Sequence, residues 1–180
     1  MKNLYFVRHG ESEFNKASVW TGSSDSPLTK LGKDQAMNVA KEILAKNLKF
    51  DLVISSPLIR AFDTAKIICE INNYPLDKVL IDPNTIERDF GTLEGDKNLI
   101  IELKYAEDES NIDHIDGVET VAHLQKRADK FYQYLKTLPQ DNILVVGHGA
   151  FARGLSRSIN NIPIGQRHIV LKNGELVKFI

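Results

Sequence analysis

Short apolar runs alternate along this chain with longer segments in which apolar residues recur at helical spacing. The apolar runs are rich in β-branched residues and bounded by polar residues, which is typical of buried strands. They span residues 3–7, 51–54, 79–81 and 142–146. The segments with helical spacing span residues 30–47, 57–71, 97–109, 118–137 and 149–159. This alternation predicts an α/β fold, a three-layer sandwich with a mostly parallel central sheet flanked by helices.

Residues that favour helix starts and turns mark the ends of several predicted elements. Thr29 can act as the N-cap of the first long helix. Ser56 followed by Pro57 predicts that the next helix starts there, with the serine as cap and the proline at the first helical position. Asn173-Gly174 lies between two β-rich segments, which predicts a C-terminal β-hairpin with a two-residue type I′ turn. Residues 8–28 are polar and rich in Ser, Gly and Asp, so we expect a loop there.

Length and composition narrow the function classes. A chain of 180 residues predicts a single domain, residues 1–180, with enough chain to bury a core. The formal net charge of −1 gives no general attraction to nucleic acid or to an anionic membrane. Cys69 is the only cysteine, so we expect it to be a buried apolar residue in a cytoplasmic protein without disulfides. The apolar run before Arg8 is too short for a signal peptide or a membrane span.

Two histidines follow apolar runs and are themselves followed by glycine. They lie in Arg8-His9-Gly10 near one end of the chain and in Gly147-His148-Gly149 near the other. The carboxyl ends of parallel strands are where open α/β sheets bind ligands, so both imidazoles are expected in one crevice. Glycine after each histidine lets a ligand approach the backbone closely. Arg8 indicates that this ligand is an anion.

Two further segments place charged groups directly after predicted strands. Arg60 falls in the first turn of the helix begun by Ser56-Pro57, where backbone N–H groups and the helix dipole favour anions. Glu87 lies in the loop after the third apolar run, and a carboxyl there can protonate a leaving oxygen. Asp89 and Glu94 are close to Glu87 in the sequence and are alternative acids. Together with both histidines, the two arginines predict a pocket for a tetrahedral dianion.

Five blocks of the sequence resemble, in order, one known family. The first block is residues 8–15, which read Arg-His-Gly-Glu-Ser-Glu-Phe-Asn. The others are Thr21-Gly22 with residues 25–36, Ser55-Ser56-Pro57-Leu58 with Arg60-Ala61 and Thr64-Ala65, Glu87 with Phe90-Gly91 and Glu94-Gly95, and Val146-Gly147-His148-Gly149. These blocks cover nearly the whole chain and resemble the histidine phosphatase superfamily, also called the phosphoglycerate mutase-like family. One Arg-His-Gly alone would be weak evidence, whereas five ordered blocks are specific.

The resemblance implies a role for each matching residue. His9 would be the nucleophile that becomes phosphorylated, and Arg8, Arg60 and His148 would bind the transferred phosphoryl group. Glu87 would be the proton donor and later the base for water. The substrate-binding set is completed by Asn15, Thr21, Gly22, Arg88 and Gly149. For Asn15 and Thr21, a role in folding the loop through side-chain to backbone hydrogen bonds is an equal alternative.

Elementary chemistry agrees with these roles. A nucleophilic imidazole must be neutral, and neighbouring arginine charges disfavour protonation of His9. Arginines can stabilise the charge of a phosphoryl transition state, so we expect no metal and no cofactor. His114, His123 and His168 lack the spacing of metal ligands. The expected enzyme is a metal-independent histidine acid-type phosphatase whose partner is a small phosphorylated metabolite, as a monomer or homodimer.

Three residues near the blocks have less specific roles. Glu119 is expected to be a charge in the first turn of a helix, with substrate contact as the alternative. Arg153 is expected to be structural. Trp20 can either stack on a substrate or close the loop that carries it.

The family also contains cofactor-dependent mutases and members that only bind ligands. Mutases resemble one another in a Glu-Arg-His-Tyr-Gly block followed by a lysine, where this chain has Asp89, Phe90 and Asn98. Mutases also use an arginine pair further on, and no arginine lies here between Arg88 and Arg127. Residues 96–116 contain seven acidic residues and two lysines. Such a segment disfavours a bisphosphate, although a solvated helix face explains it equally well.

We therefore expect phosphomonoester hydrolysis through a phosphohistidine. The alternatives are a 2,3-bisphosphoglycerate-dependent phosphoglycerate mutase and a non-catalytic phospholigand-binding regulator. The presence of His9, Arg8, Arg60, Glu87 and His148 together argues against the regulator.

Overall fold

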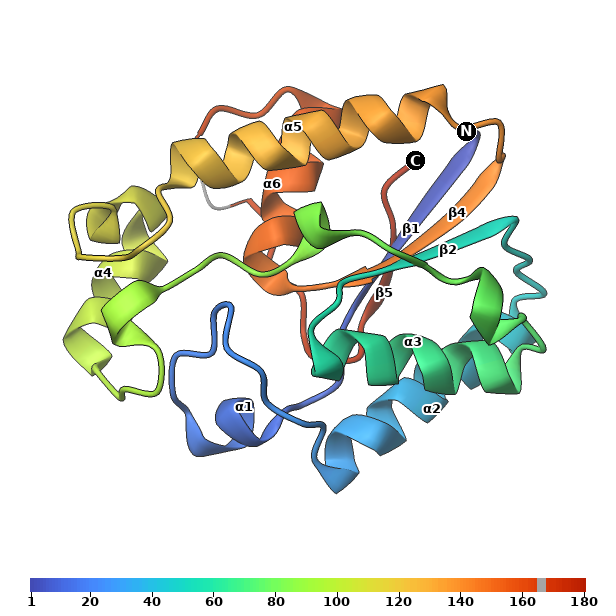
Figure 1. Ribbon diagram of the computed structural model, residues 1–180, viewed down its shortest axis with the longest axis horizontal. Coiled ribbons are helices and arrows are strands. Elements are labelled where there is room, and N and C mark those ends of the chain that lie inside the picture. Colours follow the sequence, from blue (N-terminus) through green and yellow to red (C-terminus); the bar gives the residue numbers. More distant parts are fainter. Residues whose placement is uncertain (165–167) are drawn as a thin grey trace.

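A computed structural model describes residues 1–164 and 168–180 as a five-stranded sheet with helices on both faces (Figure 1). The strands are β1 (Asn3–Arg8), β2 (Leu52–Ser55), β3 (Leu80–Ile81), β4 (Asn142–Gly147) and β5 (Leu176–Lys178). The helices are α1 (Glu13–Ala17), α2 (Lys30–Ala45), α3 (Ile59–Ile71), α4 (Leu99–Glu107), α5 (Val121–Thr137) and α6 (Gly149–Asn160). Each of the four apolar runs forms a strand, each predicted long helix is present, and the α/β class is confirmed.

The sheet is mostly parallel, as the alternation of strands and helices predicts. Its strand order is β3-β2-β4-β1-β5, and only β5 is antiparallel to its neighbour. β1 pairs with β4 so that Arg8 lies opposite Gly147. The residues that follow this pair are His9 and His148, so the sheet register alone places both histidines at the same edge.

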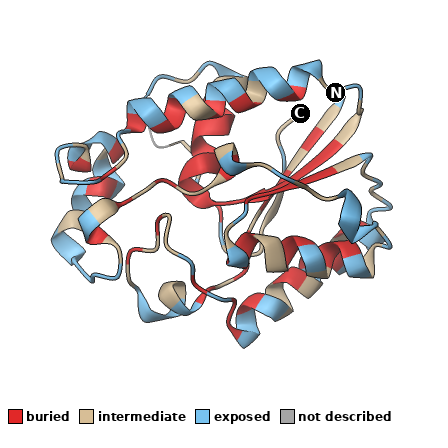
Figure 2. Ribbon diagram, viewed as in Figure 1, coloured by how far each residue is buried: buried red, intermediate tan, exposed pale blue. Residues whose placement is uncertain are grey.

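Alternate residues of the central strands face two separate hydrophobic clusters. Leu4 and Phe6 of β1, with Ile143 and Val145 of β4, pack against α5 and α6. Val7, with Leu144 and Val146, packs against α2 and α3. Figure 1 shows these two helix pairs on opposite faces of the sheet, and Figure 2 shows the buried residues between them. Burial on both faces explains why the strands are continuous apolar runs.

Helix starts follow the prediction at α2 but not at α3. Thr29 caps α2, and its hydroxyl accepts a hydrogen bond from the backbone N–H of Gly32. α3 begins at Ile59 with Leu58 as the cap residue, so Ser56 is not the cap. The hydroxyl of Ser56 accepts from the backbone N–H of Leu58 at 3.3 Å and lies 2.8 Å from Nε2 of His148. Within residues 8–28, the structure also contains the short helix α1, capped by Ser12, which the polar composition did not predict.

The C-terminal segment turns where expected but does not form the predicted hairpin. Gly174 has a φ of 63°, whereas Asn173 has no positive φ, so the turn is not type I′. Residues 168–172, the described residues that directly precede the turn, contain no strand. β5 pairs with β1 instead. The strand partner is therefore distant in sequence, which a local turn pattern does not reveal.

A separate group of residues lies over the carboxyl edge of the sheet, and we call it the cover. It consists of α4 and the short 3₁₀ turns Gly91–Leu93 and Glu109–Ile112. Its apolar contacts form a third cluster around Trp20, Phe90 and Tyr105. Among the described residues, no helix has both the length and the apolar character needed to cross a membrane.

Candidate active site

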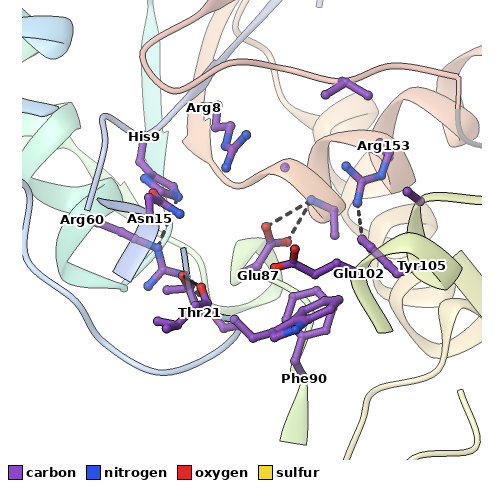
Figure 3. A pocket seen from close by; sticks show the side chains of 17 residues that line it. Arg8, His9, Asn15, Thr21, Arg60, Glu87, Phe90, Glu102, Tyr105 and Arg153 are labelled. Carbon is purple, nitrogen blue, oxygen red and sulfur yellow. Dashed lines mark hydrogen bonds between the residues drawn. The ribbon is translucent and has the colours of Figure 1, made fainter. Parts of the chain in front are cut away.

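A cavity of about 360 Å³ lies between the carboxyl edge of the sheet and the cover (Figure 3). Its floor, as we call it, is formed by Arg8 at the end of β1, His9 after it, and Arg60 in the first turn of α3. Glu87 lines one wall. These side chains come from three chain segments that meet only because parallel strands end at one edge of the sheet.

His9 is held by its backbone and by one ring nitrogen. Its backbone N–H donates to the carbonyl of Gly147 at 3.0 Å, which extends the β1–β4 pairing by one residue. Its Nδ1 lies 2.7 Å from the carbonyl oxygen of Gly10. A carbonyl can only accept, so Nδ1 carries the proton and Nε2 carries the lone pair. Nε of Arg60 donates to that Nε2 at 3.3 Å, as this tautomer requires.

The loop that carries His9 is also fixed against α2. A side chain at Gly10 would place its Cβ 2.1 Å from the carbonyl oxygen of Gly32, and one at Gly32 would place it 2.0 Å from the carbonyl oxygen of Glu11. The two backbones cross at a distance that only glycine permits. The sequence analysis expected glycine at position 10 so that a ligand can approach the backbone. The packing against α2 requires glycine there as well.

Both histidines are neutral in this environment. Burial, followed by the charges of Arg60 and Arg8, holds the pKa of His9 well below its ordinary value of 6.5. Burial and the charge of Arg60 do the same for the pKa of His148, whose ring centroid lies 5.1 Å from that of His9. A neutral His9 with its lone pair on Nε2 is the form required of a nucleophile.

These pKa shifts predict how stability depends on pH. Below pH 6.5 the unfolded chain binds protons at His9 and His148 that the folded chain does not bind, so stability falls as the pH falls. Between pH 7 and 5.5 we expect the free energy of unfolding to decrease by about 1 kcal/mol for each histidine. Urea unfolding at both pH values measures this change. His9→Asn should reduce it by about half, and an equal pH dependence in both proteins would contradict the prediction.

The arginines of the floor are oriented by backbone carbonyls. Nη1 and Nη2 of Arg60 donate to the carbonyls of Ser24 and Gly22 at 2.8 and 2.7 Å. Nη1 of Arg8 donates to the carbonyl of Leu171 at 2.6 Å, and its buried Nε has no partner among the described residues. These contacts fix the guanidinium groups without neutralising their charge. At the N-terminus of α3, the backbone N–H of Ile59 donates to the carboxylate of Asp25 at 2.8 Å.

The structure separates Glu87 from the two alternative acids. Glu87 lines the cavity, and its carboxylate accepts from the backbone N–H groups of Ala150 and Phe151 at the start of α6. Asp89 accepts from the N–H of Gly91, and Glu94 accepts from the N–H groups of Ser23 and Ser24. Neither of these two lines the cavity. Figure 3 shows the Glu87 carboxylate directed into the cavity.

Most of the predicted substrate-binding residues surround the cavity. Asn15, Thr21, Gly22 and Gly149 line it. Asn15 and Thr21 also make the loop contacts considered as their alternative role: the Asn15 side chain accepts from the N–H of Ser12 at 3.1 Å, and the Thr21 hydroxyl donates to the carbonyl of Val19. His148 is fully buried beside His9, and its Nδ1 has no partner among the described residues.

Arg88 and His148 are the predicted substrate-binding residues that do not line the cavity; His148 is nevertheless buried next to His9, whereas Arg88 is directed elsewhere. The Arg88 side chain is fully buried and donates to the carbonyls of Glu119 and Glu109 and to the carboxylate of Asp113. Every guanidinium nitrogen is therefore engaged away from the site. Glu119 lies before the cap Thr120 rather than in the first turn of α5, and it pairs with Arg127 at 2.7 Å.

Arg127 was not predicted from the sequence, although it positions the loop that carries Glu87. Its guanidinium donates to the carbonyls of Asn84, Ile86 and Glu87 at 2.7, 2.9 and 3.1 Å. Nothing in the local pattern of the amphipathic helix α5 distinguishes this arginine from the exposed charges beside it.

The cover supplies two cavity residues that sequence reasoning missed, Glu102 and Tyr105 of α4. Trp20, Phe90 and Arg153 also line the cavity, and for Trp20 substrate stacking was one of the two expected roles. The rings of Trp20, Phe90 and Tyr105 pack edge to face, with centroids 4.6 to 5.7 Å apart. Arg153, which was expected to be structural, pairs with Glu109 and also lines the cavity. Of the seven acids in residues 96–116, Glu102 alone lines the cavity.

Elsewhere, the described residues contain no group of three histidine, cysteine or acidic side chains arranged to hold a metal ion. Cys69 is buried as expected, and burial raises the pKa of its thiol to about 11.

Fold and site together define an α/β protein with a candidate oxyanion pocket at the carboxyl edge of its sheet, built from His9 and two arginines, with His148 buried beside His9. The sequence profile of the histidine phosphatase superfamily (branch 1) matches residues 4–179. The chain belongs to this superfamily, which confirms the resemblance drawn from the five sequence blocks.

Relatives of this chain include phosphatases and mutases. A 2,3-bisphosphoglycerate-dependent phosphoglycerate mutase of Rhizobium etli is 29% identical over 173 residues, which cover 91% of this chain and 83% of the relative. The structure of a mycobacterial glucosyl-3-phosphoglycerate phosphatase in complex with VO3 has a TM-score of 0.86 and 26% identity, covering 99% of this chain and 92% of that one. A phosphoserine phosphatase of Entamoeba histolytica in complex with 3-phosphoglyceric acid has a TM-score of 0.74 and 27% identity, with 99% and 90% covered.

Proposed function

We propose that this protein hydrolyses small phosphomonoesters through a phosphohistidine on His9. The observation that carries the proposal is the state of that imidazole. It is neutral, its Nδ1 proton is held by the carbonyl of Gly10, and its Nε2 lone pair lies at a floor that holds Arg8 and Arg60. A neutral nucleophile among fixed cations suits a phosphate ester, because the arginines attract the dianion without being able to accept a proton.

In the first step, Nε2 of His9 attacks the phosphorus atom and the bond from phosphorus to the ester oxygen breaks. The leaving oxygen takes a proton from Glu87 and departs as an alcohol. Oε1 of Glu87 accepts three backbone N–H groups, whereas Oε2 accepts only one. Oε2 is therefore the oxygen with room for the proton.

In the second step, the Glu87 carboxylate takes a proton from water as the water oxygen attacks phosphorus. The bond between phosphorus and Nε2 breaks, which restores His9 and releases inorganic phosphate. Arg8 and Arg60 stabilise the charge on the phosphoryl oxygens in both steps. His148 offers the partnerless Nδ1 as a further contact for these oxygens.

The wall above the floor favours hydrolysis over phosphoglycerate isomerisation. A mutase has to hold a second phosphate while the intermediate reorients. Glu102 presents a carboxylate to this part of the cavity, and an acid at that place repels a second phosphate.

A paired assay tests the proposal. With purified protein, we expect phosphate release from a panel of phosphomonoesters, and conversion of 3- to 2-phosphoglycerate at least about a hundredfold slower when 2,3-bisphosphoglycerate is added. Phosphate release measured with a dye and isomerisation measured by a coupled assay give the two rates. Efficient isomerisation with little phosphate release would replace hydrolysis by mutase activity, and the absence of both would favour a protein that only binds phospholigands.

A further inference from the structure

Glu102 lies where an acid opposes the binding of phosphate. It projects from α4 into the cavity, as Figure 3 shows, and its side chain is half-buried. Its carboxylate has no hydrogen-bond or ion-pair partner among the described residues, whereas those of Glu87, Glu94 and Glu109 each accept several bonds. An acid without an internal partner in a substrate cavity repels anions and attracts a cation.

Arg153 brings a positive group to the same cavity from α6. Its Nε donates to Glu109 and its Nη2 to the hydroxyl of Tyr105, which fixes the plane of the guanidinium. The remaining nitrogen, Nη1, has no partner within the described ranges and lies 3.8 Å from the Cβ position of Gly149, a residue that lines the cavity. Burial opposes the charge of Arg153, but its neighbours Tyr105, Glu109 and Glu87 raise its pKa, so the group is a cation.

The cavity wall beyond the floor therefore carries one free acid and one available guanidinium nitrogen. The aromatic cluster of Trp20, Phe90 and Tyr105 lines this cavity as well, and these bulky rings favour a small leaving group. A bisphosphate or a dicarboxylate would meet the acid, and a simple amine would leave the arginine unused. A small zwitterion satisfies both groups.

We propose that Glu102 and Arg153 recognise an amino acid as the leaving group, so that the substrate class is the phosphate ester of a hydroxy amino acid. The ammonium donates to the carboxylate of Glu102, and the carboxylate accepts from Nη1 of Arg153. This inference rests on the proposed function, because it assigns the leaving group of the same reaction.

Two nearly isosteric substrates isolate the role of Glu102. O-phosphoserine and 3-phosphoglycerate differ in one group, which is an ammonium in the first and a hydroxyl in the second. The ammonium is attracted to the Glu102 carboxylate as an opposite charge, whereas the neutral hydroxyl lacks this Coulomb attraction. Both substrates are used as racemates, so that a difference in stereochemistry between them does not affect the comparison. For the wild-type protein we expect kcat/KM for O-phosphoserine to exceed that for 3-phosphoglycerate by at least about tenfold.

The test compares Glu102→Gln with a matched control. Glu102→Gln should lower the ratio of the two kcat/KM values by about tenfold, because it removes the negative charge that faces the ammonium. Glu107→Gln removes the same charge from the same helix at an exposed position outside the cavity, and it should leave the ratio unchanged. An effect of net charge alone would act equally in both variants.

Phosphoethanolamine tests Arg153 without a substitution that breaks the buried pair with Glu109. It keeps the ammonium of O-phosphoserine and lacks the carboxylate, so its kcat/KM should be at least about fivefold lower. Equal ratios in wild type and Glu102→Gln, or a preference of the wild type for 3-phosphoglycerate, would overturn the inference. Hydrolysis of p-nitrophenyl phosphate without hydrolysis of O-phosphoserine would overturn it while the proposed function stands. No hydrolysis of any ester would overturn both.

Discussion

Replacement of His9 by alanine is expected to abolish turnover and covalent phosphorylation together. The substitution removes Nε2, which carries the only lone pair of a neutral imidazole at the cavity floor. With no nucleophile, the two-step route is closed, and we expect the rate to fall by at least about a thousandfold. Rapid mixing with substrate, followed by mass analysis that preserves acid-sensitive phosphate, shows whether the phosphoenzyme forms.

The control separates loss of the nucleophile from loss of the fold. The backbone N–H of His9 still donates to Gly147 after the substitution, so the β1–β4 pairing is kept. His123→Ala changes an exposed histidine on α5 and should leave turnover unchanged. Phosphate found on another residue of His9→Ala, or normal turnover by that variant, would contradict the role of His9.

Replacement of Glu87 by glutamine is expected to slow poor substrates far more than good ones. The amide oxygen can still accept the N–H groups at the start of α6, but the amide cannot give a proton to the leaving oxygen. Alkyl phosphates need that proton, and we expect about a hundredfold or greater loss with them. p-Nitrophenyl phosphate has a leaving oxygen that needs little protonation, and the loss should be several times smaller. Comparison of the two kcat values measures the difference.

Asp89→Asn is the matched variant for this experiment. It removes a carboxylate two residues away that hydrogen-bonds to the backbone of Gly91 and does not line the cavity. It should slow neither substrate selectively. Equal slowing of both substrates by Glu87→Gln would mean that a different acid protonates the leaving group.

The sequence predicts the floor of the site well because the floor depends on local signals. Arg8 ends β1 and His9 directly follows it, just as His148, buried beside His9, directly follows β4, and apolar runs of four or five residues mark both strands. The parallel register then brings the strand ends together. No tertiary contact has to be known for this part of the inference.

The arrangement of the cover could not be predicted from the sequence, because it depends on pairings between residues that are distant along the chain. Arg88 is adjacent to Glu87 in the sequence, yet it is directed at Asp113, 25 residues further on. Arg153 lies one turn from Arg157 on α6, and both pair with Glu109 of the cover. Charge and spacing alone do not show which of these arginines reaches the cavity. The same limit explains why the acidic segment 96–116 contributes only Glu102 to it.

The crossing of Gly10 and Gly32 restricts how this protein can change over generations. Each glycine meets main-chain atoms of the other segment, so no second substitution nearby can make room for a side chain at either position. Gly32 belongs to α2, a helix that contributes no residue to the cavity. Gly32 takes no part in the chemistry, yet it is as constrained as His9, the nucleophile whose loop it supports. New specificities are accessible by replacing side chains of the cover, while this crossing has to stay as it is.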